Sequence, residues 1–302
     1  MTQVLLLGHA SDAHAAHMHQ ALQSAGVEVN FWDTGDFPTQ MQLSWEPHSH
    51  EGSIVLPGGR ELLFSEIHSV YWRQFRDPFL PALKDHQQQQ IAVSDSVCAL
   101  RSLIQACPTR WVNSWRAYQF HREKPLQLAA VKKLGVPIPD TLISNDARKI
   151  QQFVQTRPRC IFKPVFGGAH TEFVTDDHLL LERMELALKL SPVTVQEYIA
   201  GTNIRSYVIG QSVYTAEIRS PSVDFRNDEK AELIPVVLPN GVCRSCLEIA
   251  RQLHLEWTAI DWRCSPEGDY VFLEANPSPM FIYFEKTTGY PITEKLVELL
   301  IS

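Results

Sequence analysis

The sequence lacks a long hydrophobic run. The apolar stretch from Val4 to Leu7 is far too short to cross a bilayer, which takes about 20 apolar residues in a helix. No longer apolar segment of the kind found in secretion signals follows Met1. We therefore expect a cytoplasmic protein without a membrane partner.

An excess of positive charge is also missing. The 302 residues include 27 Lys and Arg against 34 Asp and Glu, which gives a net charge of -7. Proteins that bind nucleic acid usually carry a basic excess, because contacts to the phosphate backbone dominate their affinity. The composition therefore predicts no nucleic-acid partner. The chain is long enough for two or three packed subdomains or one large α/β unit.

The sequence has few cysteines, and they do not form a disulfide framework. The six are scattered along the chain, so reduced thiols are the default expectation. Cys243 and Cys246 form one CxxC pair, but a structural zinc site would need a second pair of ligands at suitable spacing, and none is evident. Zinc or redox chemistry at this pair is a minor alternative.

The common nucleotide-binding signatures are absent as well. There is no GxxxxGK[ST] loop, and no GxGxxG follows the first predicted strand. No Ser, Cys or His arrangement typical of covalent catalysis is apparent either. A nucleotide site in this chain would therefore have to be built from other residues.

The amino-terminal region shows the pattern of a parallel α/β sheet. Val4 to Leu7 is a buried-strand pattern, Asp12 can cap a helix, and Gly26 ends that helix before a second strand. This order predicts one strand–helix–strand unit. Glycines and prolines between residues 40 and 60 predict hairpins, and helical periodicity runs over residues 82–106 and 113–134.

The second half of the chain has the pattern of antiparallel strands. Short apolar stretches on either side of Gly210 and Gln211 predict a hairpin. A second hairpin is predicted around the turn SPEGD at residues 265–269, after a helix at 240–254. A closing helix is expected at 291–301.

Three oxygen-bearing side chains interrupt this last hairpin. Asp261 lies on its first strand, and Glu274 and Asn276 lie two residues apart on the second. Residues two apart on a strand leave the same face, and strand pairing would bring Asp261 close to both. Oxygen ligands without histidine or cysteine suit Mg²⁺ or Mn²⁺. The alternative is a hairpin with solvated polar residues, although a carboxylate among apolar neighbours needs a partner.

Basic residues that could hold a phosphate chain occur at several places. Lys163 ends an apolar strand just before Gly167 and Gly168, and flexible backbone beside a lysine suits phosphate. Four more basic residues could contribute: Lys124, Arg205, Arg219 and Arg226. Each of them by itself would be interpreted as a surface charge. The stretch VTVQEYIAG could present backbone groups to an adenine edge, with Gln196 or Glu197 nearby.

Taken together, these segments resemble the ATP-grasp superfamily of carboxylate–amine ligases. The resemblance is greatest to the branch of ribosomal-protein glutamate ligases and microviridin-type (graspetide) peptide cyclases. It covers about residues 110–302, and its motifs have the expected order and spacing. They are EKPLQLAAVKKLGVPIPDTLISND, IFKPVFGG, VQEYIAGTNIRSYVIG, VDFRND, AIDW and VFLEANPSP. VLLLGHASDAH and VYWRQF resemble, more weakly, the pre-ATP-grasp domain of the cyclases.

The resemblance implies an α/β (α+β) fold in three parts. A parallel-sheet pre-ATP-grasp domain would occupy residues 1–110, and two ATP-grasp subdomains with antiparallel sheets would occupy residues 111–195 and 196–302. A glycine loop around Phe166 to Thr171 would close over the phosphates.

The resemblance also implies roles for individual residues. Lys124 and Lys163 would contact ATP phosphates, and Asp261, Glu274 and Asn276 would bind magnesium. Glu197, Tyr198 and Ile199, with Gln196, would line the adenine pocket. Arg226 would contact the nucleotide, and with Lys163 the arginines Arg205, Arg219 and Arg226 would act at the transferred phosphate. This branch usually has Asp where this chain has Asn203, which weakens a ribose contact there, although an amide can still bond a hydroxyl.

The implied reaction converts a carboxylate into an acyl phosphate at the expense of ATP and joins it to an amine or a hydroxyl. The expected substrate is a peptide or amino acid with an acidic side chain, and macrocyclisation or modification of a ribosomal peptide is the leading hypothesis. A ligase for free amino acids or a protein terminus is the second hypothesis, and an ATP-binding regulatory module without turnover is the third. By analogy with the branch, a homodimer is expected.

Overall fold

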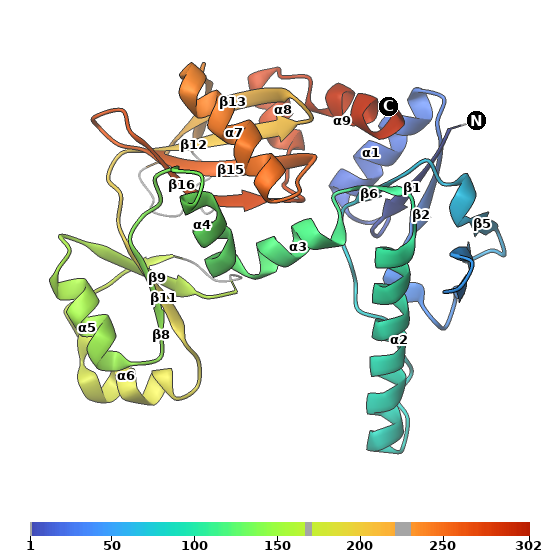
Figure 1. Cartoon of the computed structure of the whole chain (residues 1–302), viewed down its shortest axis with the longest axis horizontal. Coiled ribbons are helices and arrows are strands. Elements are labelled where there is room, and N and C mark those ends of the chain that lie inside the picture. The colour runs from blue at the N-terminus through green and yellow to red at the C-terminus, as the bar shows by residue number, and fades with distance from the viewer. Residues whose placement is uncertain (1, 167–170, 221–230) are drawn as a thin grey trace. The chain divides into compact units, whose positions relative to one another are not determined.

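The chain folds into two compact units. The computed structural model describes residues 2–166, 171–220 and 231–302, and Figure 1 shows its helices and strands in chain order. The first unit comprises Met1–Trp115, Leu255–Trp257 and Ser278–Ser302, and the second comprises Arg116–His254 and Thr258–Pro277. The three-domain division stays a prediction. Among the described residues, no helix has the length and apolar character that a membrane crossing requires.

The first unit is built on a parallel sheet with the order β2-β1-β6-β7. Its strands are β1 (Gln3–Leu7), β2 (Glu28–Trp32), β6 (Ser69–Trp72) and β7 (Arg110–Val112). All five residues of β1 are buried, as is typical of a strand covered on both faces. Helix α1 (Ala13–Ser24) begins after Asp12, whose carboxylate accepts a hydrogen bond from the Ala15 N–H at 2.7 Å. The predicted strand–helix–strand unit is confirmed.

The remaining elements of the first unit follow the predicted pattern closely. The hairpins expected between residues 40 and 60 form an antiparallel sheet of β3 (Gln42–Glu46), β4 (Glu51–Val55) and β5 (Glu61–Leu63). Short 3₁₀ turns η1 (Thr34–Asp36) and η2 (Phe64–Glu66) connect the sheets. Helix α2 (His86–Ala106) starts at Asp85, which accepts bonds from the N–H groups of Gln87 and Gln88. It extends away from the parallel sheet (Figure 1).

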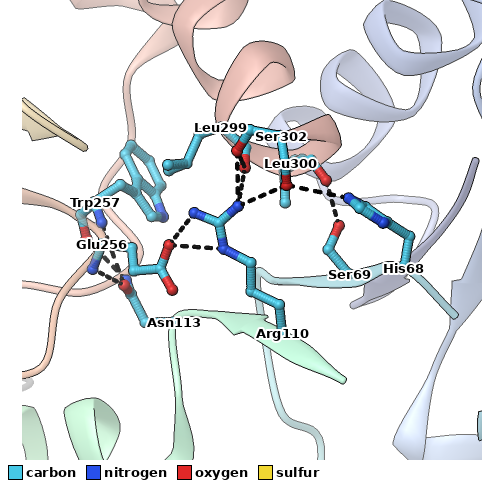
Figure 2. Close-up of polar contacts among 9 residues, drawn as sticks. All are labelled: His68, Ser69, Arg110, Asn113, Glu256, Trp257, Leu299, Leu300 and Ser302. Atoms are coloured by element: carbon cyan, nitrogen blue, oxygen red, sulfur yellow. Dashed lines mark hydrogen bonds and ion pairs between the residues drawn. The ribbon is translucent and has the colours of Figure 1, made fainter. Parts of the chain in front are cut away.

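A polar network fixes two distant segments to this sheet. Arg110 on β7 bonds Glu256, with Nε to Oε2 at 2.9 Å, and donates to the Leu299 carbonyl at 2.8 Å. Asn113 donates to the Trp257 carbonyl at 2.8 Å, and Ser69 donates to a carbonyl of α9 (Ile292–Ile301). Figure 2 shows these contacts converging from separate parts of the chain. They explain why residues 255–257 and 278–302, with α8 (Ile282–Thr288), belong to the first unit.

The second unit contains two antiparallel sheets, as predicted. The smaller sheet has the order β10-β9-β11-β8. Its strands are β8 (Thr141–Ser144), β9 (Cys160–Pro164), β10 (Glu172–Phe173) and β11 (Val193–Glu197). Helices α5 (Ala147–Gln155) and α6 (Leu181–Leu188), preceded by η3 (Asp176–Leu179), supply Ile150, Met184 and Leu188 to a core with Cys160 and Val195.

The larger sheet carries the three predicted metal ligands. Its order is β14-β13-β12-β15-β16. The strands are β12 (Thr202–Ile209), β13 (Ser212–Arg219), β14 (Glu232–Pro235), β15 (Trp257–Cys264) and β16 (Tyr270–Asn276). Both predicted hairpins form, because β12 pairs with β13 and β15 pairs with β16. The predicted helix at residues 240–254 is α7 (Asn240–Gln252).

The helical pattern at residues 113–134 does not form one helix. It divides into α3 (Trp115–Arg122) and α4 (Lys124–Lys132), with Glu123 between them. Pro125 lies in the first turn of α4, where its missing N–H costs nothing, whereas inside a continuous helix it would remove a hydrogen bond. The prediction of an uninterrupted helix was wrong for this reason.

Candidate active site

The last hairpin brings the three predicted metal ligands to one face of the larger sheet. Asp261 on β15 lies opposite Glu274 on β16, and Ala259 lies opposite Asn276. Directly opposed residues share a face, and alternate residues return to it. A register shift follows Asp261, and such a bulge bends the strand locally. The common face is therefore present, while the role of its residues as ligands stays a prediction.

Asp261 is held by an arginine of the neighbouring strand. Arg205 on β12 makes two bonds to its carboxylate, with Nε–Oδ1 at 2.7 Å and Nη2–Oδ2 at 2.8 Å. This two-point geometry fixes the orientation of both groups. Burial lowers the pKa of the Arg205 guanidinium, but Asp261 more than offsets burial and raises that pKa above its ordinary value. Arg205 therefore presents a permanent positive charge beside the carboxylates.

Glu274 is paired with the first residue of α4. Its carboxylate forms an ion pair with the Lys124 ammonium. Burial by itself raises the pKa of Glu274, but Lys124, followed by Lys163 and His121, more than offsets burial and lowers that pKa to about 2. The carboxylate is therefore charged at any physiological pH. Two predicted phosphate-binding lysines and a predicted metal ligand lie within electrostatic reach of one another.

Gln127 fixes α4 against the edge of the sheet, a role that sequence reasoning missed. Its buried side-chain amide donates to the Ala275 carbonyl at 2.9 Å and accepts from the Ala275 N–H at 2.9 Å. Lys124 lies one helical turn before Gln127, and Glu274 is adjacent to Ala275. The double hydrogen bond therefore positions the Lys124–Glu274 pair. His121 also lies near Glu274, and burial lowers the pKa of its imidazole.

Lys163 comes from the smaller sheet of the same unit. It leaves β9, and its ammonium donates to the side-chain oxygen of Gln196 on β11 at 3.1 Å. Gln196 is itself buried and donates to the Thr141 hydroxyl at 2.8 Å. The structure thus joins a predicted phosphate-binding residue directly to a predicted adenine-pocket residue. The contact gives the lysine a defined direction.

The segment predicted to contact adenine continues from the end of β11. The N–H groups of Glu197 and Tyr198 donate to the carbonyls of Asp140 and Arg159, each at 2.9 Å. The Tyr198 ring packs edge-on against Phe173, with centroids 5.0 Å apart. Backbone contacts therefore fix the start of this segment before Ile199.

Comparison with known proteins identifies the family. A sequence model described as a RimK-like ATP-grasp domain matches residues 121–300, and one described as an MvdD pre-ATP grasp domain matches residues 3–119. The chain belongs to the RimK-like ATP-grasp family. It is therefore an ATP-dependent ligase that joins a carboxylate to an amine or a hydroxyl.

Individual relatives and solved structures extend this ATP-grasp assignment. The glutamate–LysW ligase ArgX of Sulfurisphaera tokodaii is 26% identical over 239 residues, which are 72% of this chain and 84% of the relative. The macrocyclase MdnC from Microcystis aeruginosa, solved with its precursor peptide MdnA, is 25% identical with a TM-score of 0.86 and full coverage of both chains, 100% each. The ATP-grasp ligase PsnB, solved with a precursor variant, Mg and ADP, is 27% identical with a TM-score of 0.85 over 99% of this chain and 98% of PsnB.

Arg219, another arginine predicted for the ATP-grasp site, is not brought to the same face. Arg219 is exposed at the end of β13 and pairs with Glu217, with Nε–Oε1 at 3.2 Å. Ala216 is the register partner of Arg205, so alternation places Arg219 on the opposite side of the sheet. Arg226 and most of the glycine loop at Phe166 to Thr171 lie outside the described residues. Their roles stay predictions.

The donor set of this ATP-grasp face fits magnesium. Two carboxylates and one amide oxygen are the few protein ligands that Mg²⁺ typically takes beside water and phosphate oxygens. Within the described ranges, no group of three or more His, Cys, Asp or Glu offers another metal site. Each carboxylate already has a cation beside it, Arg205 or Lys124. A bound metal would share the carboxylates with these cations, whose positive charges suit the phosphates.

The departure at Asn203 has a direct structural consequence. Its side chain is buried, and its oxygen accepts a hydrogen bond from Arg263 at 2.9 Å. A ribose contact by Asn203 would therefore have to come from its amide nitrogen.

The CxxC pair lies on α7, where burial raises the pKa of the Cys246 thiol to about 12, and this disfavours the thiolate that a zinc ligand requires.

Proposed function

We propose that the chain activates an acidic side chain of a ribosomally made peptide as an acyl phosphate and joins it to an amine or a hydroxyl. The proposal rests on the face of β15 and β16 on which Asp261, Glu274 and Asn276 lie beside cations from β12 and α4. The MdnC and PsnB structures cover nearly the whole chain and contain precursor peptides, which supports a peptide substrate.

The predicted site residues other than Arg219 have a place in this proposal. Asp261, Glu274 and Asn276 would hold Mg²⁺, or Mn²⁺ in its place, which when bound would neutralise phosphate oxygens. Lys124 and Lys163 would bind the phosphates. The adenine would lie against Gln196, Glu197, Tyr198 and Ile199. Lys163 would also face the transferred phosphoryl group, together with Arg205 and Arg226, whereas Arg219 lies on the opposite side of the sheet.

The reaction needs positioning and charge neutralisation rather than a covalent enzyme intermediate. A substrate carboxylate oxygen attacks the terminal phosphorus of ATP, the bond to the bridging oxygen breaks, and ADP leaves. The acceptor then attacks the acyl carbon, loses its proton and displaces phosphate. Asp261 fixes the Arg205 guanidinium at two points, so this charge is already oriented before any negative charge develops on the substrate.

A second candidate is a ligase that acts on free glutamate or another amino acid. The similarity to the glutamate–LysW ligase, which covers 72% of this chain, favours it. The chemistry at the phosphate is the same for both candidates, so the described site does not distinguish them. Only the acceptor and donor substrates differ.

An ADP-release assay separates the two candidates. The purified chain is supplied with ATP and magnesium, and with either peptides encoded by neighbouring small open reading frames or a panel of free amino acids that includes glutamate. Our proposal predicts release with an acidic peptide and, where the acceptor belongs to the same peptide, a product lighter by one water for each bond formed. Release with free amino acids alone would support the second candidate. Silence with both, or undiminished release by Glu274→Ala, would contradict the proposed site.

We also propose that the chain acts as a homodimer through the exposed half of α2. From Gln87 to Ser94 this helix carries no charged residue, and Ile91 is 53% exposed. Ile91 and Val93, which is 38% exposed, are apolar side chains on this uncharged surface that a second copy could cover. Because the chain carries a net charge of -7, two copies would approach most readily through an uncharged surface.

A further inference from the structure

One arginine of the second unit is surrounded by the segment that follows β11. The Arg263 guanidinium on β15 donates to the Ile199 carbonyl at 2.9 Å and to the Gly201 carbonyl at 2.5 Å. It also donates to the Asn203 side-chain oxygen at 2.9 Å and to the Tyr198 hydroxyl at 3.3 Å. Four acceptors within six consecutive residues therefore converge on one side chain. A guanidinium is the only side chain with enough donors in a rigid fork to satisfy them.

The backbone of this segment is shaped to fit the arginine. Gly201 has φ +126°, a conformation that other residues rarely adopt, and a Cβ there would lie 1.9 Å from the Cys264 carbonyl oxygen. The segment therefore passes directly against the strand that carries Arg263. Tyr198 adds a ring contact, with its centroid 5.5 Å from the guanidinium carbon.

The same two strands also carry the Arg205–Asp261 pair, but there the arginine is on β12 and its partner is on β15. Asp261 lies two residues before Arg263 on β15, and Arg205 lies two residues after Asn203 on β12. Strand alternation places both contacts on the face that bears the predicted metal ligands. Asn203 is neutral where this branch usually has Asp, so Arg263 gains no carboxylate there. The guanidinium therefore contributes hydrogen bonds to the segment Tyr198–Asn203 rather than an ion pair.

We infer that Arg263 is a positioning residue that sets the conformation of the segment Tyr198–Asn203 and thereby the affinity of the site for the adenine end of a nucleotide. This inference rests on the proposed adenine contacts of Glu197, Tyr198 and Ile199. Arg263 acts through the segment, because its donors are directed to the protein itself. Asp261 of the phosphate end lies two residues before Arg263 on β15. Its carboxylate bonds Arg205, however, while Lys124 and Lys163 contact Glu274 and Gln196, so the phosphate end should depend much less on Arg263.

Calorimetry with two probes tests the inference. ADP carries both adenine and phosphate, whereas inorganic tripolyphosphate carries only the phosphate end. With magnesium present, Arg263→Ala is expected to lower the affinity for ADP by about tenfold or more, because several hydrogen bonds to a charged group are lost. The affinity for tripolyphosphate is expected to change by less than about twofold, since its contacts are untouched. Arg263→Lys cannot donate to all four acceptors, so its affinity for ADP should lie between those of Arg263→Ala and the wild type.

Two further variants exclude a general loss of folding. Gly201→Ala disturbs the same segment from the other side and should shift the ADP affinity in the same direction. Arg110→Ala removes an arginine with equally many contacts in the first unit (Figure 2) and should leave the ratio of the two affinities unchanged. In turnover, Arg263→Ala should raise the KM for ATP more than it lowers kcat.

The outcomes separate this inference from the proposed function. A wild-type chain that binds neither probe would contradict both. Wild-type binding of both probes with an unchanged ADP affinity in Arg263→Ala would overturn the positioning role alone. Equal losses for ADP and tripolyphosphate would also overturn it, because they would show a general structural effect.

Discussion

Glu274 carries a full charge in the folded protein because Lys124 compensates for its burial. The pKa of its carboxyl falls from about 4.5 to about 2. A carboxyl with a lowered pKa in the folded state stabilises the fold above its unfolded pKa, and this stabilisation disappears as the pH falls. The Lys124–Glu274 pair should therefore stabilise the protein fully above about pH 4.5 and progressively less toward pH 2.

Glu274→Gln tests this pH dependence. The free energy of unfolding, measured by urea denaturation between pH 6 and 3, should fall less steeply with decreasing pH in this variant than in the wild type. Glu248→Gln, which changes an exposed carboxylate on α7, serves as the control and should keep the wild-type slope. Parallel curves for wild type and Glu274→Gln would contradict the ion pair.

Lys163 offers a second test at a single residue. Lys163→Ala should weaken ADP binding by about tenfold or more, because a charged contact to phosphate is lost. Lys149→Ala, on the exposed part of α5, should bind ADP as the wild type does. Calorimetry measures both, and equal affinities for all three proteins would remove Lys163 from the phosphate site.

The sequence indicated charged residues in apolar surroundings as candidates for the site. It did not indicate residues whose roles depend on tertiary contacts. Asp261 and Glu274 were predictable because a carboxylate in a strand pattern needs a partner. Gln127 and Arg263 looked like ordinary surface residues, since a helix amide or a strand arginine is usually solvated. Their roles depend on which backbone lies opposite them, and local pattern does not contain that information.

At the scale of elements, α4 and β16 hold the Lys124–Glu274 ion pair of the proposed site. β16 is an edge strand of its sheet, and Gln127 satisfies the N–H and the carbonyl of Ala275 at that edge. The helix thereby covers part of an edge that would otherwise expose unpaired backbone groups. The same contact sets the position of Lys124 at the start of α4.

Gln127→Ala should therefore lower both stability and nucleotide affinity. It leaves two buried backbone groups without partners, which costs about 2 kcal/mol or more. Gln105→Ala on α2, where the side chain bonds only its own helix, should cost less than about 0.5 kcal/mol. Urea denaturation gives the stabilities and calorimetry gives the ADP affinity. A Gln127→Ala protein as stable as the control would contradict the anchoring role.

The elements themselves were largely predictable, and their breaks were less so. Caps at Asp12, Asp85 and Asp146 set helix starts as local hydrogen bonding requires. The turn at 265–269 set the pairing of β15 with β16. The division between α3 and α4 was missed because helical periodicity continues through it, although Pro125 was a local signal.

At the scale of the whole molecule, contacts between distant segments define the first unit. Arg110 and Asn113 bind residues 255–257 and the end of α9, more than 140 residues away in sequence. Local sequence patterns assign α8 and α9 to the domain that precedes them in the chain. Only long-range pairing shows that they belong with the parallel sheet.

The proposed homodimer is tested at this scale. Ile91→Glu places a charge in the exposed half of α2 and should convert a dimer into a monomer, because a buried unpaired charge is costly. Ile143→Glu, at another exposed isoleucine, should leave the oligomeric state unchanged. Light scattering coupled to gel filtration measures both. A wild-type monomer, or a dimer that survives Ile91→Glu, would contradict the interface.

A crystal structure of the chain with magnesium and ADP would show directly whether the face of β15 and β16 binds the metal. We expect a magnesium ion within bonding distance of Asp261, Glu274 and Asn276, with the phosphates against Lys124 and Lys163. A nucleotide bound elsewhere, or a metal without contact to Glu274, would contradict it.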